Sequence, residues 1–239
     1  MTETRILRLY ISINTIKYLI RRPKQFPYYL LRYLRESLDY IQFISKLLNV
    51  KEDIIRKALP EKLSWRNLEL AFKKSINPSS GEMPLSFEES MAVYLSVRLL
   101  KPKIVIETGV SAGRSSAFIL QALDDNGFGH LYSIDPDPHC GYAIPNLLKK
   151  HWTFISKKSS EVLPSLLNRV RKVDIFLHDS LHTYKNMMYE FETVWPYIAR
   201  RGILLSDDIT FNTAFQDFCQ KHYLHPVYLG KGFAGVRKL

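Results

Sequence analysis

The chain is 239 residues long, with 46% hydrophobic and 24% charged residues. This composition excludes a disordered or membrane-embedded chain, and the length suits one α/β domain of about 150 residues with an appendage. The formal net charge is +11, but it is uneven: residues 1–77 hold sixteen Lys or Arg against seven Asp or Glu, while residues 78–239 hold eighteen against sixteen.

The basic front third, residues 1–77, has the apolar spacing of amphipathic helices. Two sets recur at three- and four-residue intervals: Ile6, Leu9, Tyr10, Ile13, Ile16 and Ile20, then Leu30, Leu34, Leu38, Ile41, Ile44 and Leu48. Arg8 and Lys17 interrupt the first set, so we expect neither a membrane span nor a secretory signal. This extension is predicted to be a lid or a homodimer arm. Peripheral contact with an anionic membrane is an alternative, and nucleic acid is the least favoured partner.

The two cysteines, Cys140 and Cys219, are isolated in the sequence. Neither belongs to a Cys-x-x-Cys pair, and two are too few for a disulfide framework. We therefore expect both to be structural, in a protein of the reducing cytoplasm.

From residue 78 to residue 239, short apolar runs alternate with longer amphipathic ones, which is typical of a doubly wound parallel sheet with helices on both faces. The predicted strands are 104–107, 130–135, 152–155, 173–178 and 203–207. The predicted helices are 113–123, 144–150, 160–170, 184–199 and 213–222. A C-terminal antiparallel hairpin, pairing 225–229 with 234–237, completes a mostly parallel sheet of seven strands.

A glycine turn follows the first strand and opens a helix. Glu107 ends the strand, and Gly109 and Gly113 allow the backbone to bend and to approach a ligand without a Cβ in the way. A dinucleotide site needs a middle glycine, but Val110 and Ser111 stand there. The turn therefore favours S-adenosylmethionine, whose cationic amine an acid at Glu107 would bind directly or through water. Ser111 and Ser115, also in this turn, complete the expected donor seat.

Asp135 ends the second predicted strand, twenty-eight residues after Glu107. A carboxylate there is placed to accept both ribose hydroxyls of the donor. Ligands of open α/β sheets bind outside the carboxyl ends of the strands, where Asp179, Asp207 and Asp208 also stand.

These motifs resemble the class I S-adenosylmethionine-dependent methyltransferases, and among them the O-methyltransferases related to the catechol and the sugar and macrolide enzymes. The resemblance covers roughly residues 78–239 and lies in Glu107–Ser115, Ile134–Asp137, Lys158–Pro164, Asp174–Tyr184 and Gly202–Asp208. It implies that Ser159 lies near the adenine. It also implies that Asp179, Asp207 and Asp208 hold a divalent cation such as Mg²⁺, which lowers the pKa of the acceptor hydroxyl and orients its oxygen.

His182 lies three residues after Asp179, where the catechol enzymes place a Lys, so it is our candidate for the general base. Shaping of the loop and metal ligation are its alternative roles. Asp207 and Asp208 have the alternative role of capping a helix that starts near Thr210. His178, in place of an apolar strand residue, is expected to be structural.

The sequence thus predicts methyl transfer from S-adenosylmethionine to a hydroxyl of a small molecule, glycan or lipid, with Asp179 and His182 at the reacting centre. A metal-independent enzyme of the same fold is one alternative. A membrane-associated binding module with a vestigial cofactor site is the other.

Overall fold

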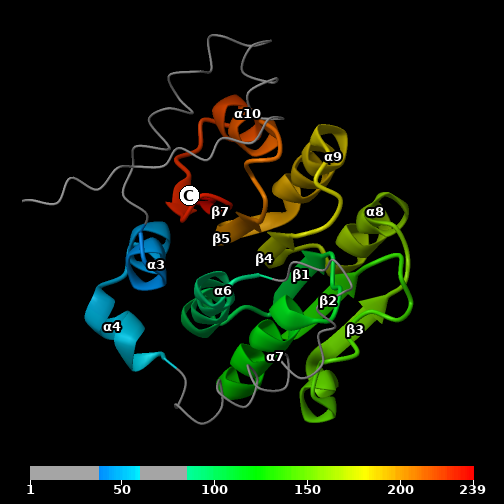
Figure 1. Cartoon of the computed structure of the whole chain (residues 1–239), viewed down its shortest axis with the longest axis horizontal. Helices are drawn as coiled ribbons and strands as arrows, with labels where there is room; N and C mark the ends of the chain where they lie inside the picture. Colours follow the sequence, from blue (N-terminus) through cyan, green and yellow to red (C-terminus); the bar gives the residue numbers. More distant parts are fainter. Residues whose placement is uncertain (1–37, 60–84) are drawn as a thin grey trace, which may run out of the picture.

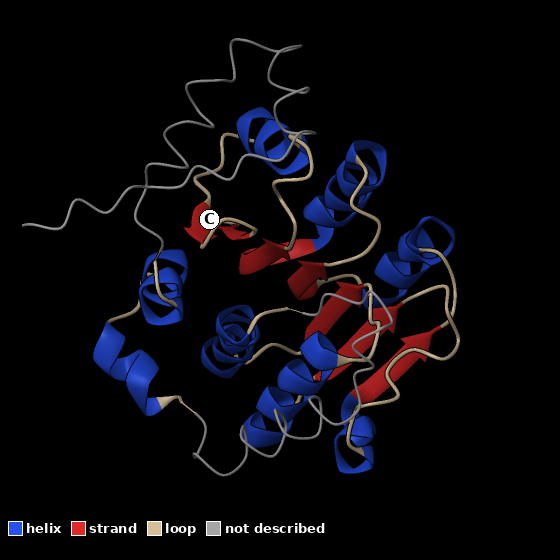
Figure 2. Ribbon diagram, in the orientation of Figure 1, coloured by secondary structure: helices blue, strands red, loops and turns tan. Residues whose placement is uncertain are grey.

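The computed structural model describes residues 38–59 and 85–239. Its centre is a seven-stranded sheet, whose strands are drawn as arrows in Figures 1 and 2. The strand order is β3-β2-β1-β4-β5-β7-β6. The strands are β1 (Ile104–Thr108), β2 (His130–Ile134), β3 (Trp152–Ile155), β4 (Val173–His178), β5 (Ile198–Ser206), β6 (Val227–Leu229) and β7 (Phe233–Arg237). All neighbours among β1 to β5 pair in parallel, whereas β7 pairs antiparallel with both β5 and β6. The predicted doubly wound sheet with a C-terminal antiparallel hairpin is confirmed.

Helices cover both faces of the sheet (Figure 1). One face packs against α3 (Tyr40–Leu48), α6 (Phe87–Leu100) and α7 (Arg114–Asn126), and the other against α8 (Ser159–Val170), α9 (Tyr184–Val194) and α10 (Ala214–Lys221). Because side chains alternate along a strand, neighbouring residues belong to different cores. Val105 is buried in the first and Ile106 in the second.

Part of the basic front belongs to the first core. Asp39 caps α3 by accepting a hydrogen bond from the Gln42 N–H at 2.8 Å. The helix then buries an apolar face of five residues, which are Ile41, Phe43, Ile44, Leu47 and Leu48. A short helix, α4 (Glu52–Lys57), follows. The predicted helices before residue 38 and the linker at 77–81 lie outside the described residues.

Two predicted boundaries are wrong, and one long helix was not predicted. The helix expected over 184–199 ends at Val194, because Pro196 lacks the N–H that would continue it. β5 then begins at Ile198, which pairs with Val173, five residues before the predicted start. The unpredicted helix is α6, which begins with a capping box between Ser86 and Glu89. The helix expected over 144–150 is instead a 3₁₀ segment, η2 (Asn146–His151).

Within the described ranges, no helix is long and apolar enough to cross a membrane.

Candidate active site

The predicted site residues gather at the carboxyl edge of the sheet because backbone hydrogen bonds tie the strand ends together. The Gly109 N–H donates to Ile134 O, the Asp179 N–H to Thr108 O, and the Asp207 N–H to His178 O, each at 2.9 Å. The ends of β2, β1, β4 and β5 therefore meet side by side. Asp135, Gly109, Asp179 and Asp207 come directly after these four strands.

The glycine turn bends as predicted, but protein atoms occupy the space beside its glycines. Gly109 has φ +85° and Gly113 has φ +96°, values that side-chain-bearing residues adopt at a cost. A Cβ on Gly109 would stand 1.8 Å from the Asp179 carbonyl oxygen. On Gly113 it would stand 2.5 Å from Ile144 Cγ1. Close packing within the protein, rather than the approach of a ligand alone, requires glycine at both positions.

Glu107 is a fully buried carboxylate beneath this turn. Its Oε1 accepts hydrogen bonds from the hydroxyls of Ser116 and Ser133, the latter at 2.6 Å. Burial raises the pKa of Glu107 to about 7 against the hydrogen bonds from Ser116, Ser133 and Ser115. The second oxygen, Oε2, is buried without a hydrogen-bond partner. An unpartnered buried oxygen of this kind would be satisfied by a cation or by a hydrogen-bond donor.

Asp135 closes the opposite side of the turn. Its Oδ2 accepts from the Val110 N–H and its Oδ1 from the Asp137 N–H, each at 2.9 Å. A carboxylate has about four lone-pair sites, so both oxygens keep capacity for a ligand's hydroxyls. Ser111, between the two glycines, is exposed and has φ 48°.

Both thiols have raised pKa values, which agrees with their expected structural role. Burial raises the pKa of Cys140 to about 12, helped by the neighbouring Asp135 carboxylate, and burial raises that of Cys219 to about 12. Both cysteines are free.

Asp179, Asp207 and Asp208 form the acidic side of the site. Burial raises the pKa of Asp179 well above its usual value, and repulsion from Asp207 and Asp208 raises it further. Burial, Glu89 and Asp208 raise the pKa of Asp207 to about 7. The pKa of Asp208 is raised by burial and by Glu89. The structure therefore brings the three predicted carboxylates close enough together that Asp207 and Asp208 oppose the ionisation of Asp179.

Glu89 is a fourth acid of this cluster that sequence reasoning missed. A Cβ at Gly232 would lie 3.9 Å from Asp207 Oδ1 and 4.0 Å from Glu89 Oε1, so the two carboxylates flank the same point. The only sequence signal was the Ser-x-x-Glu pattern of the capping box, which indicates a helix start and not a site. Glu89 comes from α6, whereas the predicted acids all follow strands.

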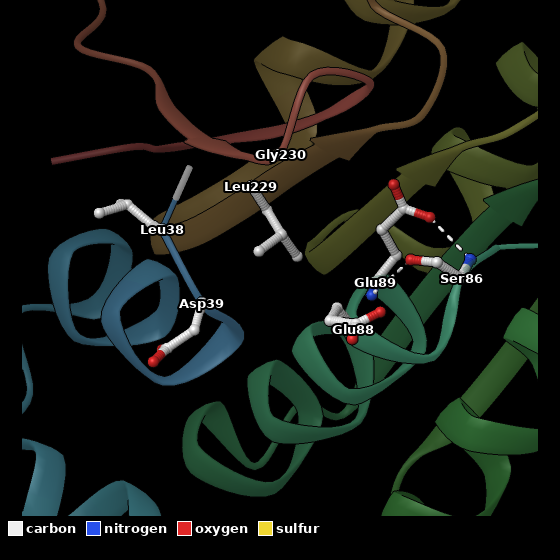
Figure 3. Close-up of a pocket in the computed structure, with 7 residues that line it drawn as sticks. All are labelled: Leu38, Asp39, Ser86, Glu88, Glu89, Leu229 and Gly230. Atoms are coloured by element: carbon white, nitrogen blue, oxygen red, sulfur yellow. Dashed lines mark hydrogen bonds between the residues drawn. The ribbon is translucent and has the colours of Figure 1, made fainter. Parts of the chain in front are cut away.

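Glu89 also lines a pocket of about 420 Å³ between α3, α6 and the β6–β7 turn (Figure 3). The Glu89 Oε2 atom accepts from the Ser86 N–H at 2.7 Å, as the dashed line in the figure shows. The lining residues are Leu38, Asp39, Ser86, Glu88, Glu89, Leu229 and Gly230. The Glu89 side chain thus lies between the pocket and the two acids that follow β5, Asp207 and Asp208.

His182 lies between two of the acids. Its Nε2 is 3.8 Å from Asp179 Oδ1, and its Nδ1 is 3.7 Å from Asp208 Oδ2. Burial and the neighbouring His178 lower the pKa of His182 to about 4, outweighing the raising effect of Glu190. The imidazole is therefore neutral at pH 7, and its Nε2 is buried without a hydrogen-bond partner. The Phe211 ring lies against it, with the ring centroids 5.7 Å apart.

His178 is fully buried behind His182, which agrees with its predicted structural role. The His178 and His182 rings meet edge to face with their centroids 5.2 Å apart. The Nδ1 atom of His178 is 2.6 Å from Glu190 Oε2. Glu190, a buried residue of α9, is the second site residue that sequence reasoning missed, because no motif marks a carboxylate on the buried face of a helix.

The helix-capping alternative for Asp207 and Asp208 is wrong. The next helix, α10, begins at Ala214, whose N–H donates to Asn212 Oδ1 at 2.8 Å. Within residues 38–59 and 85–239, no group of three or more His, Cys, Asp or Glu side chains is placed to hold a metal ion.

Comparisons with known proteins agree with this fold. Residues 106–209 match a family model described as a methyltransferase domain, and no curated protein matches the chain.

Three solved structures represent the structural neighbours. The SAH-bound methyltransferase PaMTH1 of Podospora anserina is 14% identical with a TM-score of 0.57, and the match covers 76% of this chain and 98% of that one. The O-methyltransferase TomG of Streptomyces achromogenes, in complex with SAM, is 14% identical with a TM-score of 0.55, and the match covers 76% of this chain and 92% of that one. An O-methyltransferase of Bacillus cereus, in complex with SAH, is 12% identical with a TM-score of 0.53, and the match covers 82% of this chain and 96% of that one.

The strand order and the site at the carboxyl edge define the Rossmann-like class I methyltransferase fold. The family match shows a methyltransferase domain over residues 106–209, and the shared fold agrees with the predicted S-adenosylmethionine-dependent class. The family match bears out the predicted enzyme class, and the SAM and SAH complexes of the neighbours agree with the predicted methyl donor.

Proposed function

We propose that the chain transfers the methyl group of S-adenosylmethionine to a hydroxyl oxygen of a small molecule, glycan or lipid. The observation that carries this proposal is the position of His182. It is a neutral imidazole whose buried, unpartnered Nε2 lies beside the acids after β4 and β5. A hydroxyl must lose its proton to become a good nucleophile, and a neutral imidazole is a suitable acceptor.

The donor is proposed to bind over the glycine turn. The unpartnered Oε2 of Glu107 suits the cationic amine of S-adenosylmethionine, and the free lone pairs of Asp135 suit its ribose hydroxyls. The other proposed donor-binding residues are Gly109, Ser111, Gly113, Ser115, Ser159 and Asp179. Binding of the amine would also offset the cost of burying the Glu107 charge.

A divalent cation is proposed at Asp179, Asp207 and Asp208, and their chemistry fits it. All three present carboxylate oxygens, the ligands that Mg²⁺ prefers, and they repel one another when no cation is present. In the described residues the three side chains are not gathered around one point, so binding would require them to turn toward the ion. When bound, the cation would lower the pKa of the acceptor hydroxyl. A lowered hydroxyl pKa is needed because His182, with a pKa of about 4, is a weak base.

His182 then takes the hydroxyl proton at Nε2. The Asp208 carboxylate faces Nδ1 at 3.7 Å and stabilises the imidazolium that forms. Phe211 limits the position of the ring on one side. Gly109 and Asp179 are packed together, so the donor turn (the glycine turn Gly109–Gly113) directly contacts the acceptor side of the site.

Two measurements on the full chain test this function. Calorimetry should show that S-adenosylhomocysteine binds, and labelled S-adenosylmethionine should transfer its methyl group to a member of a panel of hydroxyl acceptors. Chelation should stop the transfer, and Mg²⁺ should restore it. Transfer only to nitrogen or carbon acceptors would overturn the proposal.

A metal-independent enzyme of the same fold is the second candidate. The absence of a ready-made metal cluster in the described part of the chain favours it. Transfer that continues after exhaustive chelation would decide for this candidate.

A further inference from the structure

Glu190 binds more partners than any other buried carboxylate described above. Its Oε2 atom accepts from the Thr108 hydroxyl at 2.6 Å and faces His178 Nδ1 at 2.6 Å. Its Oε1 atom accepts from the Ser180 hydroxyl at 2.9 Å and from the Asn186 side-chain amide at 3.2 Å. The side chain of Glu190 is fully buried.

These partners come from both halves of the site. Thr108 is the last residue of β1 and directly precedes Gly109 of the donor turn. His178 and Ser180 flank Asp179, on the acceptor side. Asn186 also donates to Leu181 O at 3.0 Å, so it ties the loop that carries His182 to the same carboxylate. One carboxylate thus spans the donor turn and the acceptor loop.

The charge of Glu190 strengthens these contacts. Burial alone would raise its pKa, but the hydrogen bond and charge of His178, with the hydroxyls of Ser159 and Thr108, bring the pKa below its usual value. The carboxylate is therefore ionised, and hydrogen bonds to an ionised acceptor are about twice as strong as neutral ones. An ionised buried carboxylate is costly unless all its partners are in place, so the network has one favoured arrangement.

We infer that Glu190 is a positioning residue that sets the donor turn at its working distance from Asp179 and His182. The inference rests on the proposed function. Methyl transfer needs the donor carbon and the acceptor oxygen in line, and a misplacement of about 1 Å can reduce the rate about 100-fold. Glu190 acts from behind the site, through Thr108 on one side and Ser180, Asn186 and His178 on the other.

The test compares Glu190→Gln with Glu192→Gln in the full-length protein. Glutamine keeps the shape of the side chain but removes its charge and replaces one acceptor oxygen with an N–H₂ group, so the contacts of that oxygen must be lost or reversed in direction. Glu192 lies on the same helix and pairs with Lys221 at 2.9 Å, away from the site. Its substitution controls for the general effect of losing a carboxylate from α9.

Hydrogen exchange is the first measurement and needs no acceptor. In Glu190→Gln, faster exchange confined to residues 108–112 and 178–186 is expected, whereas Glu192→Gln should leave both segments unchanged. Calorimetry should give a dissociation constant for S-adenosylhomocysteine within about threefold of the wild type. Unchanged exchange in Glu190→Gln, or exchange that rises evenly over the whole domain, would overturn the inference.

Kinetics with an active acceptor is the second measurement. The kcat of Glu190→Gln should fall about 10- to 100-fold with little change in the KM for S-adenosylmethionine, and that of Glu192→Gln should stay within twofold. Equal kcat in the two variants would contradict the inference. If the wild type methylates no hydroxyl, the proposed function fails, and the exchange comparison still decides the role of Glu190.

Thr108→Val is a milder variant in case Glu190→Gln does not fold. It removes only the hydroxyl that joins β1 to Glu190. Faster exchange at residues 108–112 together with retained binding of S-adenosylhomocysteine is expected. No change in exchange at these residues would contradict a bridge between the two halves.

Discussion

Gly109 packs against the backbone of Asp179 so closely that a Cβ on the glycine would overlap the Asp179 carbonyl oxygen, at 1.8 Å. The first residue after β1 and the first residue after β4 are therefore in direct contact. The donor turn and the acidic side of the site form one packed unit, and a change in either must displace the other.

Gly109→Ala should destabilise the protein by about 3 kcal/mol or more, since it combines a left-handed backbone conformation with a backbone clash. Gly127→Ala is the matched control, because Gly127 has φ +76° but nothing within 4 Å of an added Cβ. It should cost about 1 kcal/mol, from conformation alone. Urea unfolding measures both, and equal losses would contradict the packing of Gly109 on Asp179.

Glu107→Gln should stabilise the ligand-free protein above pH 7. The pKa of Glu107 is raised from 4.5 to about 7, so the folded wild type holds a proton that the unfolded chain loses. Wild-type stability therefore falls as the pH rises from about 4.5 to about 7 and then levels off. Glu107→Gln has no carboxyl group to ionise at this position, so it should avoid this loss in the free energy of unfolding, which is on the order of 3 kcal/mol.

Thermal unfolding at pH 5 and pH 8 measures this effect. The gain in melting temperature of Glu107→Gln over the wild type should be larger at pH 8, and binding of S-adenosylhomocysteine should be weaker. The same substitution at the exposed Glu161 is the control. A gain that is equal at both pH values would contradict ionisation of a buried carboxylate as its cause.

His182→Gln should reduce methyl transfer about 10²- to 10⁴-fold, the usual contribution of a general base. Binding of S-adenosylhomocysteine should be retained, because the imidazole lies on the acceptor side, between Asp179 and Asp208. His222→Gln, which alters an imidazole paired with Glu192, should leave transfer unchanged. Full activity in His182→Gln would remove the base assignment and leave the loop-shaping role.

Asp207→Asn should abolish the response to Mg²⁺. A ligand that binds only the folded state stabilises it by mass action, so Mg²⁺ should raise the melting temperature of the wild type but not that of the variant. Asp53→Asn, at an exposed residue of α4, should respond as the wild type does. If Mg²⁺ shifts none of the three proteins, the cation proposal is contradicted without reference to activity.

Much of the sheet could be predicted because each central strand contains a short apolar run, and an acid or a glycine directly follows the strand. The start of β5 could not, because Arg200 and Arg201 are exposed and carry no apolar alternation. Only the pairing of Ile198 with Val173 shows that the strand begins there. α6 was missed although its capping box was visible, because its apolar residues continue around most of the helix.

The candidate site, too, could be predicted from the sequence only in part. Asp135, Asp179, Asp207 and Asp208 could be predicted because parallel strands end at a common edge, which turns sequence positions into spatial neighbours. Glu89 and Glu190 reach the same edge from helices, and helical spacing alone does not show which buried position meets a site. The low pKa of His182 was also unforeseen, since it depends on burial and on His178.

The position of β7 has a consequence for the order of folding. This strand comes last along the chain, yet it lies inside the sheet, between β5 and β6. Until residues 233–237 have been synthesised, β5 presents an unpaired edge built from the apolar run Ile203–Leu205. Open apolar edges pair readily with other chains, so a chain that stops before Phe233 should aggregate, even though every residue of the candidate site precedes that point.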